Sequence, residues 1–316
     1  MSKILVSGVK PTGRPHIGNY FGAMKQFVDL QDSYESRIFV ANLHALTTVQ
    51  NKQLLEQMSR EVVLDFLGIG LDPKKTTLYY QSDVPHVTEL AWIFSCLTTM
   101  PELMRAHAFK DAEAKNKEIN AGTFNYPMLM AADILAGETD VVPVGKDQKQ
   151  HIEIAREVAR DFNNTFGQTF KEPTEMIIET TETVLGTDGQ KMSKSYNNTI
   201  PLFGTDEEIE RAVMSIVTDS GQDIPKNVYE IHKLIKPEAE LQDFYAKNKG
   251  KYQKAKERLV KDLIKFITPM RKRREKWANK LEKVDKIVAK GGKKMRKVVH
   301  EKMLDVRHKV GLIHHE

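Results

Sequence analysis

Short runs of β-branched and aromatic residues alternate with longer helical segments from the start of the chain to about residue 165. The pattern predicts strands at residues 3–7, 37–41, 77–81 and 140–144, and helices at residues 18–30, 52–67, 87–97, 123–135 and 147–162. Alternation of this kind is typical of a parallel sheet covered by helices on both faces. We therefore expect a doubly wound, Rossmann-like α/β domain, in which ligands bind at the carboxyl ends of the strands.

The hydrophobic pattern changes after residue 199. Residues 206–218, 239–248, 251–288 and 292–311 have helical periodicity with hardly any strand signal, and Gly291-Gly292 is expected to separate the last two helices. The chain thus divides into a predicted α/β domain at residues 1–199, with inserted helices around 85–120, and an all-α domain at residues 200–316. The last helix is expected to pack back on the first domain.

The composition excludes several classes of protein. Hydrophobic residues make up 40% and charged residues 29%, and no stretch of about 18 apolar residues indicates a transmembrane helix. The apolar run after Met1 is too short for a signal peptide. A single cysteine, Cys96, cannot form an internal disulfide or an iron–sulfur site. These features predict a cytoplasmic protein.

The net charge of +5 is unevenly distributed along the chain. Residues 246–316 hold 24 basic and 8 acidic side chains, whereas the preceding 245 residues hold 24 basic and 35 acidic ones. An acidic body with a basic tail predicts one surface for a polyanion such as a nucleic acid. A solvated, lysine-rich helical face is the alternative interpretation.

A loop between the first predicted strand and helix contains Pro15-His16-Ile17-Gly18-Asn19, preceded by Pro11-Thr12-Gly13-Arg14. Gly13 permits a turn, and Gly18 provides a flat backbone position for a base or ribose. His16, near the positive end of a helix, can donate a hydrogen bond to a phosphate that gains charge during a reaction. By itself this pattern is weak and fits an ordinary surface-loop histidine better.

A second loop, Gln190-Lys191-Met192-Ser193-Lys194-Ser195, follows Gly186-Thr187-Asp188-Gly189. Two lysines three positions apart in such a loop can converge on a triphosphate and stabilise a departing pyrophosphate. A mobile loop would let them engage most strongly near the transition state. An exposed loop rich in lysine and serine is the alternative.

Together the two loops resemble the signatures of class I aminoacyl-tRNA synthetases. Pro-x-His-Ile-Gly-Asn is similar to the His-Ile-Gly-His signature, and Lys-Met-Ser-Lys-Ser at residues 191–195 matches the second signature letter for letter. Their order and their separation of about 175 residues are typical of the small members of that class, which activate tyrosine or tryptophan. The resemblance implies an enzyme with a Rossmann-like catalytic domain and a helical tRNA-binding domain.

A third segment, from Tyr126 through Met130 to Asp133, distinguishes between tryptophan and tyrosine. These three residues are spaced i, i+4 and i+7, so on a helix they share one face. A carboxylate on an apolar face needs a donor, and an indole N–H can supply one, while methionine offers a polarisable surface for an aromatic ring. The segment resembles tryptophanyl-tRNA synthetases, in which the aspartate reads the indole nitrogen; tyrosine enzymes tend to have glutamine in place of Met130.

The resemblance implies roles for individual residues. The catalytic residues would be His16, Lys191 and Lys194, with Lys110 as a further candidate for phosphate contact. ATP would be bound by Lys10, Thr12, Gly13, His16, Gly18, Asn19, Gly145, Asp147, Gln148, Lys191, Met192, Ser193 and Lys194. Tryptophan would be bound by Val6, Gly8, His44, Tyr126, Met130, Asp133, Val142, Val144 and Gln148.

Within that set, Tyr126 and Gln148 would hold the amino acid's ammonium and carboxylate, the two valines would line the indole pocket, and Asp147 would bind the ribose hydroxyls. Two residues depart from the family pattern. Lys10 stands where glutamine is common, and Lys146 where an acid is common. Lys10 could contact the substrate carboxylate or a phosphate.

The implied reaction needs no protein nucleophile, because the tryptophan carboxylate attacks the α-phosphate of ATP and a ribose hydroxyl of tRNA(Trp) then takes the acyl group. The resemblance also implies Mg²⁺ on the phosphates and a homodimer, and it places tRNA contacts on the basic helices, most densely at residues 271–274. Nearby Trp277 could stack on an anticodon base or anchor its helix in the core. Remaining alternatives are a tyrosine–tRNA ligase, a nucleotidyltransferase that makes a dinucleotide cofactor, and a non-catalytic nucleic-acid-binding paralogue.

Overall fold

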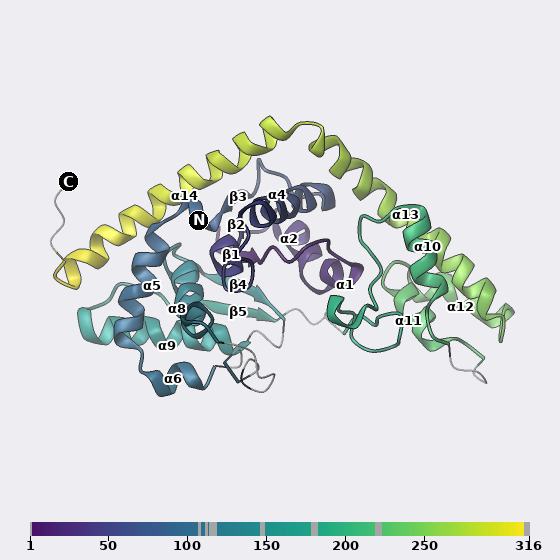
Figure 1. The fold of residues 1–316 in the computed structure, drawn as a ribbon, viewed down its shortest axis with the longest axis horizontal. Coiled ribbons are helices and arrows are strands. Elements are labelled where there is room, and N and C mark those ends of the chain that lie inside the picture. Colours follow the sequence, from purple (N-terminus) through teal and green to yellow (C-terminus); the bar gives the residue numbers. More distant parts are fainter. Residues whose placement is uncertain are drawn as a thin grey trace.

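The structure is a computed structural model that describes residues 2–106, 109, 110, 113, 119–145, 149–177, 183–218 and 223–312. Its centre is a parallel sheet with strand order β3-β2-β1-β4-β5 (Figure 1). The strands are β1 (Ile4–Val9), β2 (Glu35–Val40), β3 (Thr77–Tyr80), β4 (Val141–Val144) and β5 (Thr174–Ile177). The order reverses at β1, so the expected doubly wound α/β sheet is confirmed.

Helices cover both faces of the sheet and continue into a helical region. Around the sheet lie α1 (Ile17–Asn19), the π-helical turn η1 (Tyr20–Met24), α2 (Lys25–Leu30), α3 (Asn42–Ala45), α4 (Lys52–Ile69), the 3₁₀ turn η2 (Gln81–Asp83), α5 (His86–Leu97), α6 (Met100–Met104), α8 (Ala121–Leu135) and α9 (Lys149–Phe166). The 3₁₀ turn η4 (Lys194–Tyr196) precedes α10 (Asp206–Met214), α11 (Lys226–Lys233), α12 (Glu238–Lys247), α13 (Tyr252–Ala278) and α14 (Leu281–Lys309). No helix in these described ranges is long and apolar enough to cross a membrane.

Each face of the sheet has its own hydrophobic core, because successive side chains of a strand point to opposite faces. Leu5 and Ile38 belong to the core that contains residues of α4 and α13. Val6 and Phe39, one position further along the same strands, belong to the core that contains residues of α5, α8, α9 and α14. Strands buried on both faces account for the near-continuous apolar runs from which they were predicted.

The last two helices differ from the prediction. The expected helix at residues 251–288 breaks at Asn279 and Lys280, and Gly291 and Gly292 lie inside α14 instead of separating two helices. The prediction was wrong because these glycines serve close packing, not a turn. A Cβ atom on Gly291 would lie 2.0 Å from the carbonyl oxygen of Leu78 in β3, and one on Gly292 would lie 2.6 Å from the Asp83 carboxylate.

These contacts dock the final helix against the β3 edge of the sheet. α13 and α14 together form an arch, from the helical region back across the α/β region (Figure 1). Ion pairs from Lys302 to Glu138 and from Arg307 to Glu89 fix the far end of α14. The last helix, α14, therefore lies against the α/β region along much of its length.

Replacing Gly291 with alanine is expected to destabilise the fold by about 1–3 kcal/mol, the cost typical of an overpacked core. The added methyl group must displace either the helix or the backbone of β3. Denaturant unfolding would measure the loss, with exposed Lys290→Ala on the same helix as control. Equal stability of the two variants would show that α14 does not need this approach.

Candidate active site

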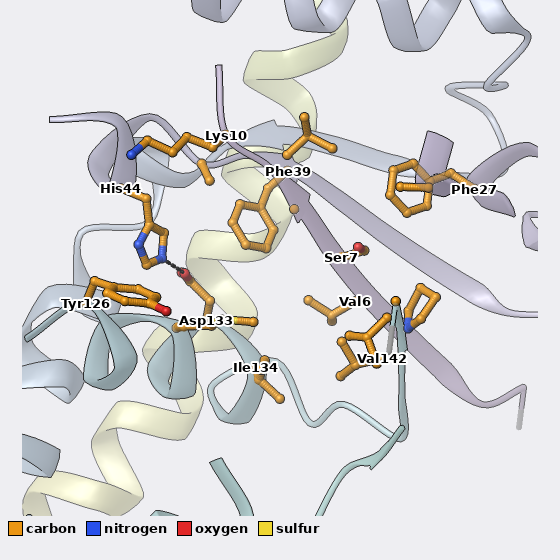
Figure 2. A pocket seen from close by; sticks show the side chains of 18 of the residues that line it. Val6, Ser7, Lys10, Phe27, Phe39, His44, Tyr126, Asp133, Ile134 and Val142 are labelled. Carbon is orange, nitrogen blue, oxygen red and sulfur yellow. Dashed lines mark hydrogen bonds and ion pairs between the residues drawn. The ribbon is translucent and has the colours of Figure 1, made fainter. Parts of the chain in front are cut away.

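A cavity of about 690 Å³ opens at the carboxyl ends of β1, β2 and β4, between the sheet and α8. Figure 2 shows its apolar floor, formed by Val6, Phe39, Ile134 and Val142. The expectation that ligands bind at this end of the strands thus has a matching cavity. Every described residue predicted to contact the amino acid lines it, and so do two residues predicted to bind ATP, Lys10 and Gly145; the first set is Val6, Gly8, His44, Tyr126, Met130, Asp133, Val142 and Val144.

Asp133 is the acidic group of this cavity. Its Oδ2 atom accepts a hydrogen bond from Nε2 of Gln81 at 2.7 Å. The same oxygen lies 3.1 Å from Nε2 of His44, the contact drawn in Figure 2. Burial raises the pKa of Asp133, and the hydrogen bonds from His44 and Gln81 oppose that rise. Both protein partners use Oδ2, and no described residue donates to Oδ1, which remains able to accept from a ligand.

Gln81 is a site residue that the sequence analysis missed. Its Oε1 atom accepts from the backbone N–H groups of Leu43 and His44, at 3.1 and 3.3 Å, while its amide donates to Asp133. The side chain therefore connects the first turn of α3 to the carboxylate on α8. Its place directly after β3, at the ligand-binding edge of the sheet, is the signal that could have identified it.

The polar wall of the cavity is made by aromatic and imidazole groups. The hydroxyl of Tyr126 lies 2.9 Å from Nε2 of His151, and the ring of Tyr126 packs edge-on to His44. Tyr126, Met130 and Asp133 all line the cavity, as their shared helical face predicts. Gly8 is needed for space, because an added Cβ atom would lie 2.5 Å from the ring of Phe39.

A smaller cavity of about 100 Å³ adjoins the first. It is lined by Thr12, Gly13, Asp65 and Lys194, among others, and Lys10 lines both cavities. Nζ of Lys10 donates to Oγ1 of Thr47 at 3.0 Å, and burial lowers the pKa of this lysine. The structure thus places a cation, without a carboxylate partner among the described residues, where the two cavities meet.

The two signature loops pack directly against each other. The backbone N–H of Ile17 donates to the carbonyl of Ile200 at 3.0 Å, and that of Leu202 donates to Pro15 at 3.0 Å. A Cβ atom on Gly18 would lie 2.8 Å from Nδ1 of His16 and 3.3 Å from Cβ of Met192. Glycine is therefore needed at this position because the two loops approach each other closely there.

Lys194 is held against the first loop. Its Nζ donates to the carbonyl oxygens of Thr12 and Gly13, at 2.9 and 3.0 Å, and partial desolvation lowers its pKa. Lys191 is exposed, and Met192 is buried in the core next to α1. The second lysine of the pair therefore lies at the smaller cavity, whereas the first faces solvent.

Asn198, a second residue that the sequence analysis missed, organises the lysine loop. It is 2% exposed; its amide donates to Asp188 and to the carbonyl of Lys191, and its oxygen accepts from Ser193 N–H. A Cβ atom on Gly186 would lie 2.3 Å from this amide. No sequence pattern considered above distinguishes Asn198 from an ordinary loop asparagine.

His16 caps the first helix and is buried. Its Nδ1 accepts from the backbone N–H of Asn19 at 3.3 Å, which leaves Nε2 to carry the ring proton. Burial, together with the charge of Lys194, lowers its pKa to about 4. The imidazole is therefore neutral at physiological pH and can act as a hydrogen-bond donor.

We expect His16 not to titrate between pH 5 and 8 in the free protein. The unfolded chain binds this proton near pH 6.5 and the folded chain only near pH 4. The contribution of His16 to the free energy of unfolding therefore falls as the pH drops from about 6.5 to about 4. NMR titration of the histidine ring signals tests this, with a His16→Gln variant to assign the peak. A midpoint near 6.5 would contradict it.

Some predicted residues cannot be placed. Lys146, Asp147 and Gln148 lie outside the described residues, so their expected roles stay predictions. Lys110 is exposed and lines neither cavity. Thr12, Gly13 and Asn19 line the smaller cavity, and Ser193 bonds within its own loop.

The basic cluster at residues 271–274 proves to be largely structural. Arg271 pairs with Asp206 and donates to the carbonyl of Gly204, and Arg273 donates to the carbonyl of Gly68. Arg274 pairs with Glu61 and Asp65 of α4. Within this cluster, Lys272 alone makes no hydrogen bond or ion pair to the described residues, and it faces solvent. The partly buried Trp277 packs against the core, which favours the anchoring alternative.

Comparison with known proteins places this geometry in a family. The family profile described as tRNA synthetases class I (W and Y) matches residues 2–284. The chain belongs to this family. Its members activate amino acids for attachment to tRNA, so the protein is an aminoacyl-tRNA synthetase, and the nucleotidyltransferase alternative is excluded.

Individual relatives are similar over nearly their whole length. A tryptophan–tRNA ligase of Fusobacterium nucleatum is 45% identical, with 98% of each chain covered, and one of Rhodopirellula baltica is 44% identical, with 98% of this chain and 99% of the other covered. The solved structure of tryptophanyl-tRNA synthetase from Campylobacter jejuni complexed with ADP and tryptophan is 40% identical, with a TM-score of 0.91 and coverage of 98% and 100%.

Proposed function

We propose that the protein is a tryptophan–tRNA ligase, which activates L-tryptophan with ATP and transfers it to the 3′ end of tRNA(Trp). The observation that carries the proposal is the buried carboxylate of Asp133 beside the apolar floor of the larger cavity. Relatives of this chain that match it over nearly full length are named as tryptophan–tRNA ligases, and one similar structure holds ADP and tryptophan.

Recognition of tryptophan follows from the shape and polarity of the larger cavity. The indole ring would lie among Val6, Phe39 and Val142, with Met130 as a polarisable neighbour. Oδ1 of Asp133 would accept the indole N–H, while Gln81 and His44 hold Oδ2 in place. Tyr126 and Gln148 would bind the ammonium and carboxylate of the amino acid.

Activation would occur where the two cavities meet. The tryptophan carboxylate attacks the α-phosphate of ATP, the bond to the bridging oxygen breaks, and pyrophosphate leaves with its electron pair. His16 donates a hydrogen bond from a neutral imidazole, and Lys191 and Lys194 stabilise charge on the phosphates. Lys10, at the junction, is placed to contact either the carboxylate or the α-phosphate.

The remaining nucleotide contacts are part of the same proposal. Asp147, next to Gly145 at the end of β4, would bind the ribose hydroxyls, and Thr12, Gly13, Gly18, Asn19, Met192 and Ser193 would complete the ATP site. Among the described residues no group of three or more histidine, cysteine or acidic side chains could hold a metal ion. Mg²⁺ would therefore be held mainly by phosphate oxygens and water, the usual arrangement at such sites.

The division into a catalytic domain at residues 1–199 and a tRNA-binding domain at 200–316 remains part of the proposal. Since the arginines at 271–274 are bonded within the chain, tRNA contacts would come from exposed lysines of α13 and α14, such as Lys272, Lys276 and Lys290. tRNA affinity should then fall steeply as salt rises from 50 to 200 mM. Filter binding tests this, and a flat dependence would contradict it.

We also propose a homodimer in the cytoplasm. Neighbouring helices α5 and α6 expose large apolar side chains: Trp92 is 68% exposed, Met100 61% and Met104 46%. Such side chains are typical of a protein–protein interface. Sedimentation velocity at micromolar concentration tests the proposal, with Trp92→Glu expected to give monomers; a monomeric parent protein would contradict it.

Aminoacylation tests the function as a whole. With ATP, Mg²⁺ and tRNA from a bacterial source, the protein should attach tryptophan, and not tyrosine, to tRNA in an alkali-labile ester. Failure to charge tRNA with any amino acid would favour the non-catalytic alternative. Charging with tyrosine would overturn the assignment of the pocket while keeping the fold and the phosphate contacts.

A further inference from the structure

The buried carboxylate of Asp65 has no part in the reaction described so far. Asp65 lies on α4 and is 3% exposed. It lines the smaller cavity together with Lys194, Thr12 and Gly13. A buried carboxylate is costly unless it is paired. A carboxylate buried beside the proposed catalytic lysine therefore needs an ion-pair partner, and its role has to be explained.

The partner comes from the helical region. Nε of Arg274, on α13, donates to Oδ1 of Asp65 at 2.6 Å, and the same guanidinium pairs with Glu61 one turn earlier on α4. Arg274 also packs over the ring of Phe203, at 5.2 Å from the ring centroid. A Cβ atom on Gly68 would lie 2.8 Å from Cβ of Arg274, so the two helices touch at this point.

The charges form a series from α13 to the first signature loop. Desolvation lowers the pKa of Lys194, and the negative charge of Asp65 opposes that shift. Burial and then the positive charge of Lys194 lower the pKa of His16. Burial raises the pKa of Asp65 to about 6, against the opposing charge of Arg274. Asp65 and Lys194 line the same small cavity without forming an ion pair, so their charges face each other across that cavity.

We propose that Asp65, fixed by Arg274, is a positioning residue for Lys194. Its charge keeps the Lys194 ammonium at the mouth of the nucleotide cavity, so that the lysine can pass from the carbonyls of Thr12 and Gly13 to the phosphates. The contact between α13 and α4 thereby orients a catalytic group that lies on neither helix. This inference rests on the proposed role of Lys194 and adds the groups that set its position.

The test is a double-mutant cycle between Asp65 and Lys194. Asp65→Asn retains the size of the side chain and an acceptor for Arg274 but removes the charge. In the parent protein it should lower kcat of tryptophan-dependent ATP–pyrophosphate exchange about tenfold, with the KM for tryptophan unchanged. In a Lys194→Ala background the same substitution should change kcat less than twofold, because no lysine remains to be positioned.

Glu61→Gln is the matched control, since Glu61 pairs with the same arginine but does not line the cavity. It should leave kcat within twofold of the parent. Thermal unfolding is measured for every variant. If Asp65→Asn does not fold, Arg274→Gln is tested in the parent protein and in the Lys194→Ala background. It should lower kcat by less than tenfold in the parent protein and leave kcat unchanged where Lys194 is absent.

Three results would overturn the proposal: an equal loss of kcat in both backgrounds, an equal loss in Glu61→Gln, or no loss in Asp65→Asn. Equal losses would assign Asp65 a purely structural role in joining α4 to α13. Absence of exchange in the parent protein would instead contradict the proposed function, so the two failures are distinguishable.

Discussion

Replacement of Asp133 with alanine is expected to abolish most tryptophan activation while ATP binding survives. The substitution removes the proposed acceptor for the indole N–H and leaves Gln81 and His44 without their shared partner. An unpaired buried polar group costs about 1–3 kcal/mol, which corresponds to a loss of roughly 5- to 150-fold in kcat/KM for tryptophan. The loss should appear mainly in the KM for tryptophan.

Exchange kinetics and ATP binding by calorimetry measure the two halves of this prediction. Asp133→Asn separates the roles of the residue, because an amide oxygen can still accept from one donor but carries no charge. Asp161→Asn, an exposed carboxylate on α9, is the control. Unchanged tryptophan affinity in Asp133→Ala would make Asp133 a structural aspartate that serves only Gln81 and His44.

The second large effect is expected at the lysine loop. Lys194→Ala should slow adenylate formation by roughly 10²–10³-fold, or about 2–4 kcal/mol, because it removes a charge that acts on the phosphates in the transition state. The KM for tryptophan should change little, since Lys194 does not line the larger cavity. Single-turnover formation of the adenylate is the measurement that isolates this step.

Lys226→Ala is the matched control, because Lys226 is an exposed lysine at the start of α11, away from both cavities. Its rate should equal that of the parent. If Lys194→Ala formed adenylate at the parental rate, the charge of the second signature would have no role in activation, and the positioning role of Asp65 would lose its target.

The parts of the fold that could be predicted are those whose sequence pattern is local. Strands β1 to β4 and the helices around them follow from apolar runs, because both faces of the sheet are buried. β5 was missed, since Thr174–Ile177 is a short edge strand that begins with two polar residues. Gly291 and Gly292 were misinterpreted because the reason for glycine lies in β3, far away in the sequence.

The same distinction applies to the site. Asp133, Met130 and Tyr126 could be predicted because they share one helix face, and the two signature loops because their residues are contiguous. Gln81 and Arg274 act through partners on other elements, at separations of 52 and 209 residues. The position of Gln81 after β3 indicates a site residue, but no pattern within a short window identifies its contact with Asp133 or that of Arg274 with Asp65. Arg274 was therefore predicted to lie on a surface for tRNA.

The central claim is that this protein activates tryptophan through the pocket around Asp133. Amino-acid-dependent ATP–pyrophosphate exchange, run with each of the twenty amino acids and without tRNA, tests it most directly. The account predicts exchange with tryptophan alone. Exchange with tyrosine in place of tryptophan would contradict it, and so would the absence of exchange with every amino acid.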